Sequence, residues 1–265
     1  MMLRFLPSKT SKALGVFLVL ALLFGSCAKT IKNPVIAHRG AWKTKEIPQN
    51  SIAALKEAIS LKSFGAEFDV RLTKDNVPVV NHDRDFLGIE IDTSTYEQLL
   101  TKKLPNGEKI PTLREYLVEG LQQKNTKLIL EIKSAPSNKE RTLKLAELSV
   151  AMVHELDGRD MVEYICFDYD AGKLVSQLDP EAEVAYLNGD KTPAQLKADG
   201  YTGIDYNHKV YKNNPTWIKE AQELGLKVNV WTVNKEEDMN YFLDQNVDFI
   251  TTDEPELLFN ILNKK

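Results

Sequence analysis

Short apolar segments alternate with longer amphipathic segments along most of the chain, from about residue 34 to the C-terminus. The apolar segments are rich in β-branched residues, which is typical of strands buried on both faces of a parallel sheet. They cover residues 35–37, 66–72, 77–81, 128–132, 162–167, 183–187, 201–205, 228–233 and 248–251. Each of these segments is therefore a predicted strand.

The segments between the predicted strands carry apolar residues at helical spacing. In residues 51–61 the apolar positions form one stripe of a helix, and Asn50 or Ser51 is suited to cap its start. The same spacing occurs in residues 139–156, 215–224 and 236–244. Strand–helix alternation over roughly 230 residues predicts a parallel sheet, and at this length a closed (β/α)8 barrel of the TIM type is favoured over an open sheet.

Nine predicted strands compete for the eight places in such a barrel. Residues 73–76 (Thr-Lys-Asp-Asn) have turn chemistry and join the second and third strands too closely for a helix to intervene. One solution is an antiparallel hairpin with a strand extra to the barrel, in which Asp69 and His82 would be cross-strand neighbours. The alternative is that residues 201–205 are not a barrel strand. Either way, we expect a small insertion after the third predicted strand.

The N-terminus differs in character from the rest of the chain. Residues 1–12 carry three cations and no acids, residues 13–24 are almost unbroken apolar, and Gly25-Ser26-Cys27 follows. A basic start, a short apolar run and small residues are typical of a secretory signal. The run is too short to span a bilayer, which takes about 20 residues as a helix.

The segment ending in Cys27 resembles the bacterial lipoprotein box, in which the cysteine is lipidated and becomes the new N-terminus. Phe24 stands where that pattern prefers Leu, and the alternative is an ordinary signal peptide. The resemblance implies a signal peptide (residues 1–26), a tether (27–33) that begins at lipidated Cys27, and a single domain (34–265). Ala28 rather than Asp follows the cysteine, which favours the outer membrane over the inner one. We therefore expect an exported lipoprotein on the periplasmic or surface side of the cell.

Composition and cysteine content narrow the class of protein. Hydrophobic residues make up 43% of the chain and charged residues 27%, which is ordinary for a globular domain. A formal net charge of −4, with no basic cluster, argues against a nucleic-acid partner, and no feature indicates a protein partner. Cys27 and Cys166 are the two cysteines, so no disulfide framework is expected. Cys166 lies in an apolar predicted strand and is interpreted as a small buried hydrophobe.

Acidic residues with strand spacing stand near the ends of two predicted strands. Glu67 and Asp69 are two positions apart, so both carboxylates point to the same face. Two like charges on one face cost free energy unless a cation lies between them, which indicates a hard divalent metal ion. Glu131 and Lys133 repeat the spacing and place a carboxylate and an ammonium group on one face.

Cationic and imidazole groups occur at the same kind of position. His38 and Arg39 end the first predicted strand, and His82 follows the third. Since the carboxyl ends of barrel strands converge, three carboxylates, two cations and two imidazoles would meet at one end. Such a set suits phosphodiester cleavage, because a metal and two cations neutralise phosphoryl oxygens while two imidazoles transfer protons near neutral pH.

Seven motifs, in order along the chain, link it to a known family. They are residues 38–40 (His-Arg-Gly), 48–51 (Pro-Gln-Asn-Ser), 67–70 (Glu-Phe-Asp-Val), 79–83 (Val-Val-Asn-His-Asp), 130–133 (Leu-Glu-Ile-Lys), 230–234 (Val-Trp-Thr-Val-Asn) and 252–255 (Thr-Asp-Glu-Pro). The chain in this way resembles the glycerophosphodiester phosphodiesterases from about Pro34 to Pro255, nearly the whole predicted domain.

The resemblance implies metal-dependent hydrolysis of a small glycerophosphodiester to sn-glycerol 3-phosphate and an alcohol. It implies one divalent cation, Mg²⁺ or Ca²⁺, on Glu67, Asp69 and Glu131, with His38 and His82 as the acid/base pair, Arg39 and Lys133 near the phosphate, and Trp231 in the pocket wall. For Trp231 a place in the core is the alternative. Attack by water and attack by a neighbouring substrate hydroxyl, through a cyclic phosphate, are both compatible with these residues.

The chain also departs from the family pattern. Gln49 and Ser51 replace an acid and a threonine, so Gln49 is not counted as a ligand, and residues 84–88 differ in a segment that bears on substrate preference. His154, expected on a helix surface, and His208 are left outside the catalytic set. The competing functions are cleavage of intact lipid headgroups, as by phospholipase D and sphingomyelinase D enzymes, and binding of a phosphorylated ligand without catalysis.

Overall fold

The computed structural model describes Met1, residues 33–135 and residues 138–264. The predicted signal peptide after Met1, the predicted lipidation site Cys27 and all of the predicted tether except Asn33 lie outside these residues. Within the described part of the chain, no helix is both long enough and apolar enough to cross a membrane.

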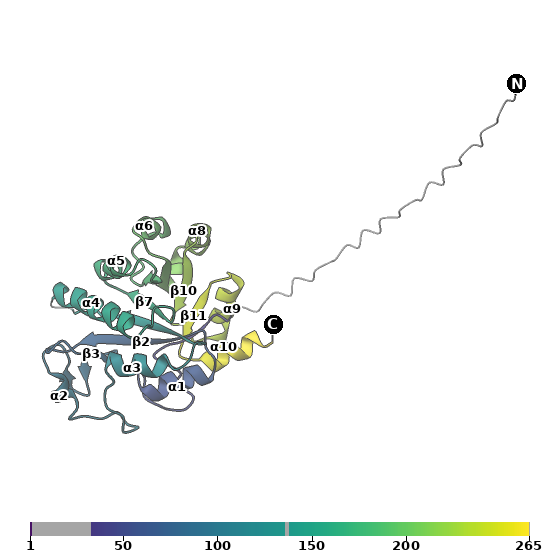
Figure 1. Ribbon diagram of the computed structural model, residues 1–265. Helices are drawn as coiled ribbons and strands as arrows, with labels where there is room; N and C mark the ends of the chain where they lie inside the picture. The colour runs from purple at the N-terminus through teal and green to yellow at the C-terminus, as the bar shows by residue number, and fades with distance from the viewer. Residues whose placement is uncertain (2–32, 136–137, 265) are drawn as a thin grey trace. The chain divides into compact units, whose positions relative to one another are not determined.

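Eight parallel strands form a closed barrel in the described residues, and helices are arranged around it (Figure 1). The barrel strands, in their order around the barrel, are β1 (Val35–Ala37), β2 (Gly65–Leu72), β6 (Lys127–Ile132), β7 (Val162–Cys166), β8 (Val184–Tyr186), β9 (Gly203–Asn207), β10 (Lys227–Trp231) and β11 (Phe249–Thr252). The sheet closes because β1 pairs with β2 on one side and with β11 on the other. The predicted TIM-type barrel is confirmed.

Helices connect successive barrel strands and cover the outside of the barrel. They are α1 (Ile52–Ser60), α3 (Leu113–Gly120), α4 (Lys139–Glu155), α5 (Tyr169–Leu178), α6 (Pro193–Ala198), α7 (His208–Asn213), α8 (Trp217–Glu223), α9 (Glu236–Asp244) and α10 (Pro255–Leu262). The four helices predicted from apolar spacing correspond to α1, α4, α8 and α9. Ser51 caps α1, since its hydroxyl accepts a hydrogen bond from the Ala54 N–H at 3.0 Å.

The ninth strand, β3 (Pro78–Val80), forms a hairpin with the end of β2 and is extra to the barrel. The alternative for residues 201–205 is wrong, because β9 lies between β8 and β10 in the barrel. The predicted pairing of Asp69 with His82 is wrong by one residue, since the Asn81 N–H donates to the Asp69 carbonyl at 2.9 Å. The cause is the turn: Thr73 N–H donates to the Val77 carbonyl at 3.1 Å, which centres the hairpin on residue 75.

The expected insertion follows β3 and has a small core of its own. It contains β4 (Asp85–Phe86), β5 (Ile89–Glu90) and α2 (Tyr96–Leu99). Its buried side chains, together with one from β3, are Val79, Phe86, Ile91, Leu99 and Ile110. The insertion thereby has a core separate from the barrel interior, beside the hairpin of β2 and β3.

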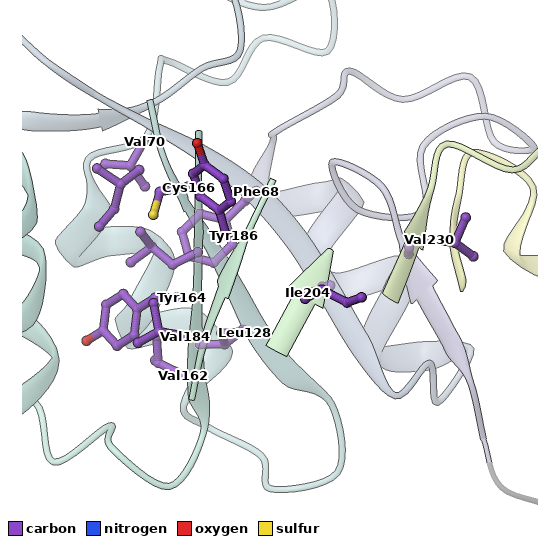
Figure 2. Close-up of a cluster of buried hydrophobic side chains, with 14 of the residues drawn as sticks. Phe68, Val70, Leu128, Val162, Tyr164, Cys166, Val184, Tyr186, Ile204 and Val230 are labelled. Atoms are coloured by element: carbon purple, nitrogen blue, oxygen red, sulfur yellow. The ribbon is translucent and has the colours of Figure 1, made fainter. Parts of the chain in front are cut away.

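Strand side chains divide into an outer and an inner set. The outer set packs under the helices and includes Phe68, Val70 and Tyr164 (Figure 2). Cys166 belongs to this set and is fully buried, as predicted. The inner set is apolar deep in the barrel, where Ile129 belongs to a small buried cluster. Toward the carboxyl ends of the strands the inner positions become polar, and these positions form the candidate site.

Candidate active site

Three buried carboxylates from two adjacent barrel strands point into the barrel. Glu67 and Asp69 come from β2 and Glu131 from β6, where it is the register partner of Asp69. Each offers one oxygen, and these oxygens lie within 4.8 Å of one another. Oxygens on opposite sides of a Ca²⁺ ion, each 2.3–2.6 Å from it, are about 5 Å apart, so the spacing suits oxygen ligands of one divalent cation.

Burial in the barrel strongly affects the pKa values of the three carboxyl groups. Burial, helped by the neighbouring negative charges, raises the pKa of Glu67 well above its usual range and that of Glu131 to about 7. Burial also opposes ionisation of Asp69, but attraction to Lys133 and other positive groups outweighs it and lowers the pKa to about 2. Oε1 of Glu67 is buried without a hydrogen-bond partner among the described residues. A bound cation would compensate this oxygen, so the residues present fit a metal.

Two cations flank the carboxylates. The ammonium group of Lys133 lies 2.7 Å from Glu131 Oε1 and 3.2 Å from Asp69 Oδ1. Nε of Arg39 lies 3.6 Å from Asp69 Oδ2, and its Nη1 donates to Gln49 Oε1 at 2.7 Å. Gln49 thus orients Arg39, in keeping with its exclusion from the ligand set. The Arg39 and Lys133 side chains thus place positive charge beside the carboxylate cluster.

The loop between β1 and α1 holds the backbone in a tight, left-handed path. Arg39 has φ of 56°, Gly40 of 79° and Asn50 of 58°. A Cβ on Gly40 would lie 2.6 Å from the backbone carbon of Ala54, so only glycine fits. The Arg39 N–H then donates to Glu67 Oε2 at 2.8 Å, which ties this loop to the carboxylate cluster.

Asn50 holds Asp69 from the same loop. Its Nδ2 donates to Asp69 Oδ2 at 2.8 Å, and its Oδ1 accepts from the Asp69 N–H at 3.0 Å. Both groups are buried, with Asn50 4% and Asp69 1% exposed. The reciprocal bonds fix the carboxylate plane of Asp69, which leaves its other oxygen, Oδ1, facing Lys133.

His38 is held by a carboxylate from the far end of the sequence. Its Nδ1 donates to Oδ1 of Asp253 at 2.7 Å, and Oδ2 of Asp253 accepts from Nδ2 of Asn234 at 2.6 Å. Burial would raise the pKa of Asp253, but the hydrogen bond and charge of His38 outweigh it, so this pKa is lowered. Nε2 of His38 points toward the carboxylates and lies 3.9 Å from Glu67 Oε2.

His82 follows β3, the second strand of the hairpin with β2, and is the more exposed of the two imidazoles. Its side chain is 37% exposed, against 19% for His38. Nδ1 of His82 lies 2.8 Å from Oδ1 of Asp83, and Nε of Arg71 donates to the His82 carbonyl at 2.7 Å, which anchors the backbone. Burial lowers the pKa of His82 below its usual range, against the attraction of Asp69.

These groups surround a cavity of about 300 Å³ at the carboxyl end of the barrel. The cavity lining includes seven of the residues predicted from sequence, namely His38, Arg39, Glu67, His82, Glu131, Lys133 and Trp231. The eighth, Asp69, is buried beside the cavity, with its Oδ1 3.2 Å from the Lys133 ammonium group. Trp231 packs edge-on against Phe167, with ring centroids 5.6 Å apart, and both rings face the cavity.

Neither of the two remaining histidines lines the cavity. His208 begins α7, outside the lining residues. His154 is less exposed than predicted, because its Nε2 lies 2.6 Å from Oδ2 of the buried Asp179 and its side chain is only 26% exposed.

Sequence reasoning missed several polar residues of the site. Asn50, Asn234 and Asp253 lie inside three of the family-like motifs, so attention to every polar position in those motifs would have found them. Asp205 lies outside the motifs, and the strand expected over residues 201–205 ends at this residue, whereas β9 continues to Asn207. Phe167, one residue beyond β7, is visible only as part of an apolar run.

A family model describes most of the chain. Residues 38–257 match the model of the glycerophosphoryl diester phosphodiesterase family. A glycerophosphodiester phosphodiesterase of Caldanaerobacter subterraneus subsp. tengcongensis is 32% identical over 256 residues, which cover 88% of this chain and 99% of that protein.

Solved structures show the same architecture. A glycerophosphodiester phosphodiesterase from Parabacteroides distasonis superposes with a TM-score of 0.85 at 46% identity, covering 88% of this chain and 98% of that one. An Oleispira antarctica phosphodiesterase in complex with the product sn-glycerol-3-phosphate has a TM-score of 0.76 at 22% identity, covering 86% of this chain and 96% of that one. The second likeness concerns the fold alone.

Proposed function

The chain belongs to the glycerophosphoryl diester phosphodiesterase family of enzymes, and we propose on that basis that it hydrolyses small glycerophosphodiesters to sn-glycerol 3-phosphate and an alcohol. The observation that carries the proposal is the composition of one cavity. Two carboxylates, two cations and two imidazoles line about 300 Å³ at the end of the barrel where TIM-barrel sites lie, and a third carboxylate, Asp69, is clustered with the first two. Cleavage of a phosphodiester requires groups that neutralise charge, groups that position the phosphate and groups that transfer protons.

Glu67, Asp69 and Glu131 are the residues that would hold one divalent cation, Mg²⁺ or Ca²⁺. When bound, the cation supplies Lewis-acid stabilisation of negative charge on the phosphoryl oxygens. Asn50 keeps Asp69 in a fixed orientation, and the Arg39 N–H does the same for Glu67. The ligand set is thereby preorganised by hydrogen bonds from a single loop.

Arg39 and Lys133 bind and orient the phosphate, and His38 and His82 move the protons. With Nδ1 of His38 donating to Asp253, the proton-transferring atom is Nε2, which faces the cavity. One imidazole removes the proton from the attacking oxygen and the other protonates the leaving alkoxide. Phe167 and Trp231 form an apolar wall that displaces water from the reacting groups.

The test is release of glycerol 3-phosphate by the protein from residue 28 onward. Glycerophosphocholine, glycerophosphoethanolamine and glycerophosphoglycerol are supplied with EDTA, and then with Mg²⁺ or Ca²⁺ restored. We expect metal-dependent release that is abolished in His38→Ala and His82→Ala. His154→Ala is the matched control, because His154 is paired with Asp179 away from the cavity. Release from no diester under any metal would overturn the proposal, and intact phospholipids in micelles would then be assayed.

We also propose that residues 1–26 direct export and that Cys27 is lipidated, with the domain held at the outer membrane. The support is the basic, apolar and small-residue pattern that ends in Cys27 and Ala28. Mass spectrometry of the N-terminal peptide should show a diacylglyceryl cysteine. Cys27→Ser should move the protein from the membrane fraction to the soluble fraction, whereas Cys166→Ser should not; an unchanged distribution for Cys27→Ser would contradict the anchor.

A further inference from the structure

Asp205 is a buried acid in the cavity that the proposed chemistry does not use. It lies on β9 with 1% of its surface exposed, and it lines the cavity that holds the carboxylates and imidazoles. In the closed barrel β9 is four strands from β2 in either direction, so Asp205 stands across the barrel from Glu67 and Asp69. The indole N–H of Trp231 donates to the backbone carbonyl of Asp205 at 2.9 Å, which ties the ends of β9 and β10 together in the cavity wall.

The Asp205 side chain is incompletely satisfied within the protein. Its Oδ1 is buried without a hydrogen-bond partner among the described residues, where an unmet polar atom is costly. The neighbouring Asn229 side chain is shared: its amide interacts with the Asp205 carboxyl, while its Nδ2 donates to Thr251 Oγ1 at 2.8 Å and its Oδ1 accepts from the Val230 N–H at 2.9 Å. Asp205 also borders a separate void of about 30 Å³, which has room for a water molecule but not for a substrate. Because Asp205 also lines the main cavity, a group that enters this cavity can reach its carboxyl.

We propose that the Asp205 carboxyl binds a hydroxyl group of the glycerol half of the substrate and makes the site selective for glycerol-containing diesters. The inference rests on the proposed function and names the contact that would recognise its substrate class. A hydroxyl both donates and accepts hydrogen bonds and brings no charge to a buried position. Burial raises the pKa of Asp205 to about 8, so the neutral carboxyl also has a donor and an acceptor to offer.

The depth of Asp205 decides which half of the diester it meets. Of the residues that line the cavity, His82 has a side chain 37% exposed, which marks the open side, whereas Asp205 is 1% exposed. The alcohol half of a glycerophosphodiester varies in size and needs the open mouth, while the glycerol half is constant and fits a closed end. Ile165 and Leu187 line the cavity beside Asp205 and provide apolar contact for the glycerol carbons.

Two pairs of ligands separate glycerol recognition from phosphate chemistry. The first pair is sn-glycerol 3-phosphate and propyl phosphate, which differ by two hydroxyls, with binding to the full chain measured by calorimetry. The second is glycerophosphocholine and bis(p-nitrophenyl) phosphate, compared by kcat/KM. The variants are Asp205→Leu and Asp205→Asn. The control is Glu163→Gln, at a half-buried, inward-facing acid that lines the small void and not the main cavity.

We expect the parent protein to bind glycerol 3-phosphate about tenfold more tightly than propyl phosphate, as one good hydrogen bond allows. Asp205→Leu should lose this preference while its affinity for propyl phosphate stays within threefold. It should also lower kcat/KM for glycerophosphocholine about tenfold or more, with bis(p-nitrophenyl) phosphate changed less than threefold. Asp205→Asn should retain part of both preferences, and the control should retain them in full.

If Asp205→Leu still prefers glycerol 3-phosphate to propyl phosphate, the proposal is overturned. It is also overturned if the variant loses affinity or kcat/KM equally for both members of each pair, which would indicate a purely structural role. A loss confined to one headgroup, when glycerophosphocholine and glycerophosphoglycerol are compared, would place the contact on the alcohol half and also overturn it. If Asp205→Leu does not fold by circular dichroism, Asp205→Ala takes its place with the same expected results. If the parent cleaves no glycerophosphodiester, the proposed function fails, but the binding comparison still tests Asp205.

Discussion

Replacement of Asp253 by Asn would test whether the carboxylate behind His38 sets its orientation for catalysis. The change keeps the shape of the side chain and removes its charge. Oδ2 of Asp253 accepts from the Asn234 amide at 2.6 Å, and Oδ1 accepts from His38 at 2.7 Å. Asn234 cannot turn its own oxygen toward the new amide, because that oxygen accepts from the Asp253 N–H at 2.9 Å and from Thr252 Oγ1 at 3.1 Å. The NH₂ group that Asp253→Asn introduces would therefore face the Asn234 donor on one side. On the other side, His38 could accept from it only in the tautomer that carries its proton on Nε2, the wrong atom for a general base.

The size of the effect follows from the bond that is lost. A hydrogen bond to a charged group contributes about 1.5–3 kcal/mol, and about 1.4 kcal/mol corresponds to a factor of ten in rate. We expect kcat for glycerophosphocholine to fall about 10- to 100-fold in Asp253→Asn, with KM and calorimetric metal affinity nearly unchanged. The fall lies in kcat because Asp253 acts through His38, and its carboxylate is bonded to His38 and Asn234 rather than to the groups that would hold the metal.

Asp83 provides the matched control, because it makes the corresponding contact to His82 at 2.8 Å but has a side chain 76% exposed. An exposed ion pair contributes about 0–1 kcal/mol, so Asp83→Asn should lower kcat by less than about fivefold. Steady-state kinetics on the two variants and the parent, at saturating metal, make the comparison. Asp253→Asn activity within threefold of the parent, or equal losses in the two variants, would refute the positioning argument.

Four further changes have outcomes that the structure specifies. Lys133→Met leaves the buried carboxylates without their cation and should lower the free energy of unfolding in EDTA by about 3 kcal/mol, measured by urea denaturation, with Ca²⁺ restoring part of the loss. Glu131→Gln removes one of three ligand oxygens and should weaken Ca²⁺ binding at least about tenfold by calorimetry; unchanged affinity would exclude this residue as a ligand. Gly40→Ala forces a Cβ to 2.6 Å from the Ala54 backbone and should cost more than about 1 kcal/mol of stability in the same denaturation assay, together with activity, because Arg39 must move. Burial raises the pKa of Glu163 from 4.5 to about 7, so the parent loses up to about 3 kcal/mol of stability as pH rises through this window; Glu163→Gln should be more stable than the parent at pH 8 and equal to it below pH 4.5, and a constant difference would refute the assignment.

Local pattern was sufficient for much of the fold and for most of the candidate site. Strand and helix segments follow from side-chain periodicity, which is a property of neighbouring residues and needs no tertiary contact. The inward orientation of Glu67 and Asp69 follows from the alternation of side chains along a strand, and the same rule placed Glu131 beside Lys133. The export signal and lipidated Cys27 remain predictions of the sequence.

Register and long-range partners required the tertiary structure. Asp69 faces Asn81 rather than His82 because one hydrogen bond in the turn, from Thr73 to Val77, shifts the hairpin by a residue. Asp253 meets His38 across 215 residues because β11 closes the barrel against β1. Asp205 faces the carboxylates only once the whole ring of strands has formed. Such contacts depend on how the hydrogen-bonded ring closes, and the free energy that selects one closure is distributed over every strand pair and over the packing of the core.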